Sequence, residues 1–377
     1  MDRGSYEAYR ENLRRLAVSS IEPHAAALDR EARFPEASLD AFKELGLVSL
    51  AFSEENGGQG GDVLSQVIAL EELARVCATS SLTLMVIWAG LVPVAKHGSQ
   101  KLRDEVIRPA MAGDTVASIC LTEPAGGSNL FGLKTRAEKI GNEWVLNGQK
   151  RYITNATRSD WYTVLARTGE KTLGLFSVHK DDPGISFGKR ESKMGIKGSP
   201  TADVIFDNCR IPEHRVVGEQ DKGHEYITES LTWTRALIGG QALGIAQGAM
   251  DQAVKYTSER EQFGETISRF QMIRGKIADM ATDIEAGRAL LYRAAEAIDN
   301  READARALGS MAKLFCSDAA MRVTTEAVQL HGGAGYLSDF PVERMMRDAK
   351  ITQIYEGVNE IQRLIIAKHV YDRAENR

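Results

Sequence analysis

The stretch Val116-Ala117-Ser118-Ile119-Cys120-Leu121 marks a change of pattern in the middle of the chain. It is apolar and partly β-branched, and similar short runs follow it at 144–146, 161–166, 173–178 and 204–206. Two turn-forming pairs, Gly141-Asn142 and Asn147-Gly148, lie between these runs. The pattern predicts a small β domain, built either as a barrel or as a pair of sheets.

Helical periodicity occupies the chain on both sides of this β-rich region. On the N-terminal side, Leu39, Phe42 and Leu45 share one helical face, after Pro35 and before Gly46. On the C-terminal side, apolar residues recur at helical spacing over 231–259, 273–284, 311–327 and from 343 onward. We therefore expect an α+β multidomain protein. Its predicted parts are an N-terminal helical domain over 1–113, a central β domain over 114–220 and a C-terminal four-helix bundle over 221–377.

Composition narrows the class of protein. The 377 residues carry a formal net charge of -5, from 47 basic and 52 acidic side chains, so no overall positive charge favours nucleic acid or an anionic membrane. The charged N-terminus lacks the apolar run of a secretory signal, which predicts a cytoplasmic location. The four cysteines form no CxxC pair and are expected to be buried thiols in a reducing compartment: Cys77, Cys120, Cys209 and Cys316.

One segment has the length of a membrane span. Residues 76–95 carry no charge, but they include several polar or helix-breaking residues: Thr79, Ser80, Ser81, Thr83, Gly90 and Pro93. That polar content favours a helix buried in protein, and we expect no membrane association.

The sequence lacks the common motifs of metal, serine and nucleotide sites, and three other segments remain as candidates. The turn Leu121-Thr122-Glu123-Pro124-Ala125-Gly126-Gly127-Ser128-Asn129 offers hydroxyl and backbone N–H groups to a flavin edge and its phosphates. A plain surface turn explains it equally well. Arg260-Glu261-Gln262-Phe263-Gly264 places a cation beside a ring, suited to phosphate and adenine or simply to ending a helix. Gln329-Leu330-His331-Gly332-Gly333 permits close backbone or diphosphate approach, although His331 alone is more often structural.

A single carboxylate near the C-terminus is the strongest candidate for catalysis. It lies in Lys350-Ile351-Thr352-Gln353-Ile354-Tyr355-Glu356-Gly357, after an apolar-periodic run and directly before a glycine. Partial burial between apolar neighbours would raise the pKa of Glu356 and make it a better proton acceptor. Local sequence alone favours the alternative, an exposed glutamate at the end of a helix.

Taken together, six segments resemble the acyl-CoA dehydrogenase family over essentially the whole chain. They occur in the family's order: 121–129, 147–155, 193–199, 260–264, 329–336 and 346–363. The family fold is an α domain, a β domain and a C-terminal four-helix bundle, which agrees with the order expected from periodicity.

The resemblance implies noncovalently bound FAD. Its flavin ring is expected against Cys120, Thr122, Tyr152 and Thr154, with Ser128 near the diphosphate and Thr154 near N5. The adenosine half is expected from a neighbouring subunit, at Arg260, Phe263, Gln329 and Gly333. A complete flavin site then requires an oligomer, and the expected one is a homotetramer.

The resemblance also implies the reaction. Glu356 matches the base that removes the Cα proton of an acyl-CoA thioester, while hydride leaves Cβ for flavin N5 and a trans-2-enoyl thioester forms. The backbone N–H of Glu356 and a ribityl hydroxyl are expected to bind the thioester oxygen. Arg235, Tyr355 and Gly357 are the expected substrate contacts, and an electron-transfer flavoprotein is the expected oxidant. The substrate is expected to be a short or branched acyl-CoA.

Several positions depart from the family pattern. Thr234 occupies the place where some branches carry the base, which strengthens the assignment to Glu356. Asn129 replaces Asp, Tyr152 replaces Trp and Val358 replaces Thr. Thr232 stands where many members carry an Asp that contacts CoA, so an acyl group on a carrier protein is an alternative substrate.

Two further alternatives keep the same fold. An oxidase or monooxygenase would react with O₂, and a nucleic-acid-binding member would need a basic face, against which the net charge argues. Pocket depth is expected to depend on Trp88, Leu91, Leu231 and Trp233. The bulk of Trp88 and Trp233 suggests a shallow pocket, although a place in the core would explain both tryptophans as well.

Overall fold

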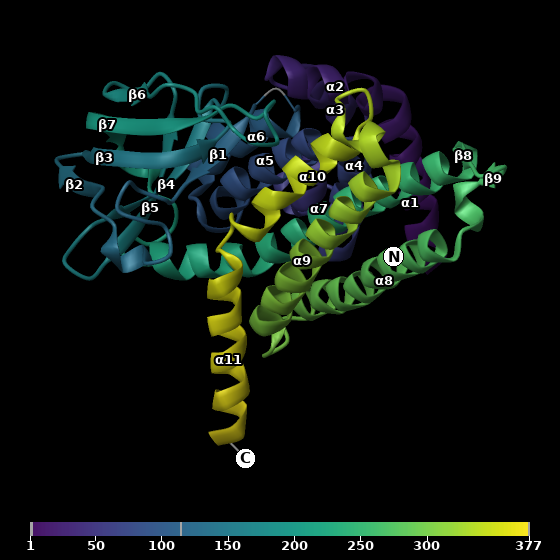
Figure 1. Cartoon of the computed structure of the whole chain (residues 1–377). Coiled ribbons are helices and arrows are strands. Elements are labelled where there is room, and N and C mark those ends of the chain that lie inside the picture. Colours follow the sequence, from purple (N-terminus) through teal and green to yellow (C-terminus); the bar gives the residue numbers. More distant parts are fainter. Residues whose placement is uncertain (1–2, 114, 376–377) are drawn as a thin grey trace.

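The N-terminal region is helical, as predicted. The computed structural model describes residues 3–113 and 115–375; Asp114, where the pattern changes, lies outside the described residues. The helices are α1 (Arg3–Leu16), α2 (Glu22–Glu31), α3 (Glu36–Glu44), α4 (Val63–Val76), α5 (Ala78–His97) and α6 (Gln100–Met111) (Figure 1). Asp62 and Ser99 cap α4 and α6 by accepting backbone N–H groups of Ser65 and Leu102.

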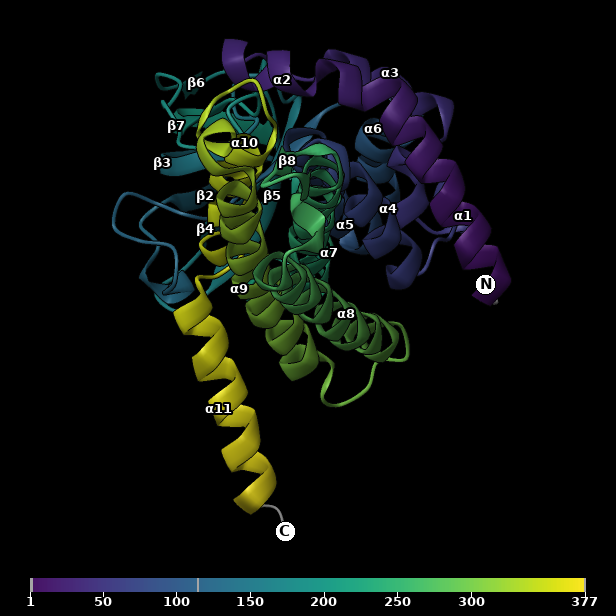
Figure 2. The ribbon, with the colours of Figure 1, turned by 45° about the vertical axis from the view of Figure 1, so that its right-hand side comes forward.

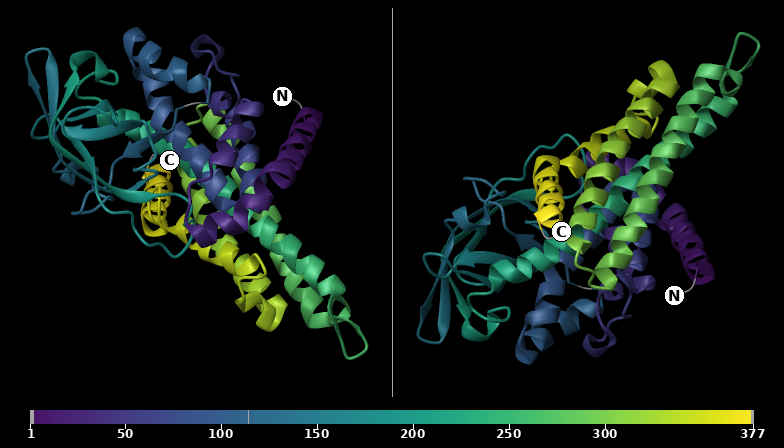
Figure 3. Two further views of the ribbon diagram at one scale, coloured as in Figure 1. Left: turned by 90° about the horizontal axis from the view of Figure 1, so that it is seen from above. Right: turned by 90° about the horizontal axis from the view of Figure 1, so that it is seen from below.

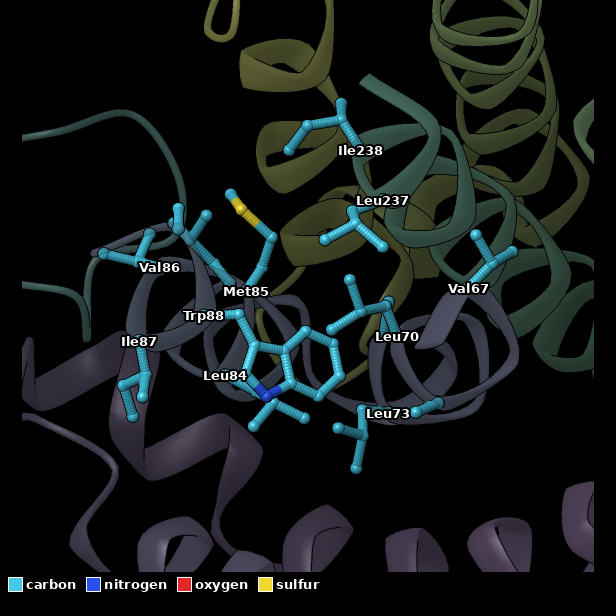
Figure 4. Packing of buried hydrophobic residues seen from close by; sticks show 14 of the residues in the cluster. Val67, Leu70, Leu73, Leu84, Met85, Val86, Ile87, Trp88, Leu237 and Ile238 are labelled. Carbon is cyan, nitrogen blue, oxygen red and sulfur yellow. The ribbon is translucent and has the colours of Figure 1, made fainter. Parts of the chain in front are cut away.

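Helix α5 is the segment with the length and hydropathy of a membrane span. Every residue of its most apolar window is buried inside the protein. It packs against α4 and α7, and Figure 4 shows side chains of these three helices gathered around Trp88. The prediction of a helix buried in protein is confirmed.

The central region forms one connected seven-stranded sheet within the described residues. Its strands are β1 (Ala117–Cys120), β2 (Arg136–Ile140), β3 (Glu143–Thr154), β4 (Trp161–Arg167), β5 (Leu173–His179), β6 (Ile185–Phe187) and β7 (Thr201–Pro212). Their order is β1-β4-β2-β3-β7-β6, and β5 pairs with β4. The β1–β4 pairing is parallel, whereas the long β3–β7 pairing is antiparallel.

The predicted turn at Asn147-Gly148 is wrong. Both residues lie inside β3, where the register against β7 shifts between Leu146 and Gly148. Gly148 has φ +148°, and a Cβ there would lie 2.5 Å from Thr135 Oγ1, so the glycine permits a bulge and a close contact. Gly141-Asn142 does connect β2 to β3. Because the bulge lets the strand continue, β3 is far longer than the predicted run at 144–146.

Three long helices dominate the C-terminal region: α7 (Gly223–Glu259), α8 (Gln271–Asp299) and α9 (Ala305–His331). A hairpin of β8 (Glu261–Gln262) and β9 (Glu265–Thr266) joins α7 to α8. Seen from above and below, the β domain lies at one end of the molecule and this hairpin at the other (Figure 3).

The predicted fourth long helix is interrupted. Helix α10 (Val342–Lys350) is followed by a short 3₁₀ turn, η8 (Ile351–Gln353), and α11 (Asn359–Glu375) begins after a loop. Glu356 has φ +52° and Gly357 has φ +92° in that loop, which a continuous α-helix does not allow. Helix α11 extends away from the body of the molecule (Figures 1 and 2).

A stripe of glycines brings α7 against α4. Gly240, Gly244 and Gly248 recur every four residues, so they lie on one face of α7. A Cβ added at Gly244 would lie 2.1 Å from the carbonyl oxygen of Glu71, and one at Gly248 would lie 2.0 Å from that of Arg75. The two backbones therefore touch where the N-terminal helices meet the C-terminal ones.

We expect Gly244→Ala to lower stability by about 1–3 kcal/mol, because the added methyl overpacks this contact. Gly275→Ala on α8 is the matched control, since nothing lies within 4 Å of its Cβ position. Alanine is a better helix former than glycine, so the control should gain about 0.5–1 kcal/mol. Urea unfolding measures both. Equal changes in the two variants would show that the α4–α7 contact is not tightly packed.

Candidate active site

A cavity of about 880 Å³ opens between the β domain and the C-terminal helices. The loop after β1 and the end of β3 form one wall, and the loop between α10 and α11 forms another. Apolar side chains of α5 contribute Leu82, Met85 and Val86. The α7 residues on the wall are His224, Thr228, Leu231 and Arg235.

Glu356 lines this cavity and is half-buried. Its Oε2 accepts a hydrogen bond of 2.8 Å from Thr234 Oγ1 on α7. Burial raises the pKa of Glu356, although the Thr234 hydroxyl and the cations of Arg235 and Lys313 oppose the shift. The alternative of an exposed helix-end glutamate is therefore wrong. Thr234, at the alternative base position, holds the carboxylate instead.

The loop that carries Glu356 is fixed by its neighbours. The hydroxyl of Tyr355 donates to Gln241 Oε1 on α7. Burial raises the pKa of the Tyr355 hydroxyl well above its ordinary value. Gln362 Nε2 donates to the carbonyl oxygen of Gly357 at 2.8 Å. Lys313 Nζ on α9 donates to the same oxygen at 2.9 Å. These contacts support a left-handed loop that would be strained on its own.

The wall formed by the loop after β1 and the end of β3 contains four of the five residues predicted to contact a flavin ring or its diphosphate: Thr122, Ser128, Tyr152 and Thr154. Cys120 is the exception. Its side chain lies fully buried in the core of the β domain. Successive side chains along a strand point to opposite faces, and the neighbours Ile119 and Leu121 line the cavity. The Cys120 side chain therefore does not line the cavity, and the expected contact between this residue and the flavin stays a prediction.

A buried ion pair supports this wall. Lys150 Nζ on β3 lies 2.9 Å from Glu123 Oε1 and 3.1 Å from the carbonyl oxygen of Leu121. Glu123 also accepts the backbone N–H groups of Lys134 and Thr135, at 2.6 and 3.0 Å. The pair therefore ties both ends of the 121–135 loop to β3. Sequence patterns did not single out Lys150 or Glu123 for this role.

Arg235 is a buried cation on the cavity wall. Only 5% of the residue is exposed, and its Nε has no hydrogen-bond partner among the described residues. Burial, followed by the nearby Arg306, lowers its pKa to about 10. Arg306 also lines the cavity. An anionic or strongly polar ligand would satisfy these groups.

Four other predicted site residues lie outside this cavity. Arg260 and Phe263 belong to the α7–α8 connection, and Gln329 and Gly333 lie where α9 ends. All four are exposed, and none lines the cavity. The rings of Tyr256 and His331 stack at 4.4 Å, so the ends of α7 and α9 lie side by side and the four residues share one end of the molecule.

The bulky residues predicted to limit the pocket are mostly structural. Trp88 Nε1 donates to the carbonyl oxygens of Leu47 and Val48, and Trp233 Nε1 donates to Gln66 Oε1 at 2.7 Å. Neither tryptophan nor Leu91 lines the cavity, whereas Leu231 does. The tryptophans therefore give no sign of a shallow pocket. Thr232 also does not line it, and its hydroxyl donates to the carbonyl oxygen of Thr228.

Comparison with known proteins agrees with this architecture. Three acyl-CoA dehydrogenase family profiles match the chain: the N-terminal domain over 4–114, the middle domain over 118–209 and the C-terminal domain over 221–371. A probable acyl-CoA dehydrogenase of Mycobacterium leprae is 48% identical over 363 residues, which are 95% of this chain and 93% of that protein.

Solved structures show the same similarity. Butyryl-CoA dehydrogenase of Megasphaera elsdenii superposes with a TM-score of 0.93 at 36% identity, over 97% of this chain and 98% of that one. An acyl-CoA dehydrogenase of Bacillus anthracis in complex with FAD gives 0.93 at 30% identity, over 99% of this chain and 68% of that one. The chain therefore belongs to the acyl-CoA dehydrogenase family of FAD-dependent oxidoreductases.

Proposed function

We propose that this protein catalyses the α,β-dehydrogenation of a short or branched acyl-CoA thioester, with Glu356 as the base. The observation that carries the proposal is the position of Glu356, which shares one cavity with the hydroxyl-rich wall of Thr122, Ser128 and Thr154. The short acyl group is supported by the similarity to butyryl-CoA dehydrogenase.

The residues on that wall fit the family's cofactor. Thr122, Ser128 and Thr154 bring hydroxyl groups to a single wall, and Gly127 lies so close to Thr122 that a Cβ there would be 2.7 Å from Thr122 Oγ1. A larger residue at position 127 would fill the space beside that hydroxyl. Bound there, FAD would supply the acceptor for the hydride that leaves Cβ.

The protein's own contribution is proton removal and positioning. Glu356 takes the Cα proton, and its raised pKa makes it a stronger base than a fully hydrated carboxylate. The Thr234 hydroxyl holds the carboxylate in one orientation. The backbone N–H of Glu356 would donate to the thioester oxygen and stabilise the charge that develops there. Arg235, Tyr355 and Gly357 line the same cavity and would position the thioester.

The adenosine half of FAD is proposed to contact a second copy of the chain. Arg260, Phe263, Gln329 and Gly333 are exposed together at the end of the molecule away from the cavity wall. Phe263 is 95% exposed, so its ring is accessible to a neighbouring subunit. A homotetramer would bring these residues to the cofactor of a neighbouring subunit.

Anaerobic flavin bleaching tests the proposed reaction. Butyryl-, isobutyryl-, octanoyl- and palmitoyl-CoA are mixed in turn with the purified holoenzyme, and the loss of visible flavin absorbance is followed. Butyryl- or isobutyryl-CoA should bleach the flavin fastest, and added electron-transfer flavoprotein should restore turnover. A butyryl group on an acyl-carrier protein is mixed with the enzyme in the same way. Bleaching by that thioester and by none of the CoA esters would identify the carrier protein as the substrate's carrier. Rapid reoxidation by air would favour an oxidase.

A further inference from the structure

A buried cation contacts the loop that carries Glu356. Lys313 on α9 is fully buried, and its Nζ donates to the carbonyl oxygen of Gly357 at 2.9 Å and to Asn359 Oδ1 at 2.7 Å. Asn359 is held in turn by Ser317 and Asp318, at 2.9 and 2.8 Å from its Nδ2. Lys313 thus contacts both the loop after η8 and the first residue of α11.

This charge is costly for the folded protein. Both acceptors of Lys313 are neutral oxygens, and no carboxylate lies within ion-pair distance of its Nζ among the described residues. Burying an ammonium without a paired anion opposes folding, and burial lowers the pKa of Lys313 to about 8. A neutral amide donor such as glutamine could hydrogen-bond to these oxygens without burying a charge. Stability alone therefore does not explain a lysine here.

The charges that face Lys313 come from every element around it. Glu356 contributes the strongest attraction, followed by Asp318 on α9. Arg235 on α7 repels it, and Glu360 on α11 attracts it. Two of these four groups, Glu356 and Arg235, line the cavity. Asp318 already accepts hydrogen bonds from Asn359 and Gln353, so the carboxylate most affected by the lysine is Glu356.

We infer that Lys313 is a positioning residue for the proposed reaction: it fixes the Glu356 loop and its positive charge keeps the Glu356 carboxylate ionised. The inference rests on the proposed role of Glu356. Thr234 acts on the carboxylate directly, whereas Lys313 acts through the backbone of the loop and through its electric field. The cation offsets the desolvation that raises the pKa of Glu356.

Two substitutions separate the charge from the hydrogen bond. Lys313→Met removes both, and Lys313→Gln retains an N–H donor without the charge. In both variants the acid limb of the pH profile of kcat/KM should move upward by on the order of one pH unit. At pH values below that limb the rate should fall by up to roughly tenfold, mainly in kcat, and at about pH 9 it should approach that of the unmodified enzyme. Lys101→Gln on the exposed surface of α6 changes the net charge equally and should leave the profile unchanged.

A second readout does not depend on turnover. Infrared difference spectra across a pH titration report the protonated carboxyl band of Glu356, which is assigned by its absence in Glu356→Gln. The midpoint of that band should rise in Lys313→Gln. If the band and the acid limb stay where they are in the unmodified holoenzyme, while only thermal stability or flavin content changes, Lys313 is a structural residue and the inference is wrong. If Glu356→Gln turns over acyl-CoA normally, the proposed function itself is wrong.

Discussion

Glu356→Gln should retain FAD and lose the ability to reduce it with acyl-CoA, with a rate lower by roughly 10²–10⁴-fold. Glutamine is close in shape to glutamate and can still accept a hydrogen bond from Thr234, so the loop should keep its conformation. Its neutral amide cannot accept the Cα proton. Stopped-flow bleaching with butyryl-CoA, measured with equal flavin content, gives the rate.

Glu296→Gln is the matched control for this substitution. Glu296 is an exposed carboxylate on α8 that does not line the cavity, and its loss removes the same charge. This variant should bleach at the unmodified rate. Normal bleaching by Glu356→Gln would exclude Glu356 as the base. Loss of FAD from that variant would instead point to a structural role for the carboxylate.

The order of helical, β and helical regions was predictable from sequence because each pattern persists over many residues. Apolar residues at helical spacing in 231–259 and 311–327 lie within α7 and α9, and the β-rich run at 161–166 lies within β4. Predictions failed where backbone conformation departs from the regular pattern. The bulge in β3 uses a glycine pair that usually forms turns, and the left-handed Glu356 interrupts an apolar period that otherwise continues into α11.

The candidate site was only partly visible in the sequence for a different reason. Glu356, Thr122 and Thr154 lie in recognisable segments, but their neighbours come from distant parts of the chain. Lys313 was not identified because a single lysine in a helix usually faces solvent. The one signal was its setting, since Ala312, Cys316 and Ala320 place position 313 beside a buried face. Likewise, the alternation of side chains along β1 shows that Cys120 points away from the cavity only when it is known which face of β1 borders the cavity.

Lys150→Met should destabilise the protein by about 3–5 kcal/mol and weaken FAD retention, because it leaves Glu123 buried without its cation. Burial alone would raise the pKa of Glu123, but the Lys150 ammonium and the backbone donors outweigh it and lower that pKa. Without Lys150 the carboxylate still accepts the backbone N–H groups of Lys134 and Thr135, but it has lost its cation. The 121–135 loop carries Thr122 and Ser128, so loosening it disturbs the proposed flavin wall.

Two further variants identify why Lys150→Met should lower stability and FAD retention. Lys150→Met combined with Glu123→Gln removes both charges and should recover much of the stability, because an uncompensated charge is costlier than a neutral pair. Lys139→Met breaks the exposed pair with Glu213 at the edge of β2 and should cost only about 0–1 kcal/mol. Urea unfolding and the flavin-to-protein absorbance ratio measure the two effects. If Lys150→Met were as mild as Lys139→Met, the buried pair would not hold the loop. If the double variant were stable but still lost FAD, the ion pair itself would be needed to shape the flavin wall, beyond its effect on stability.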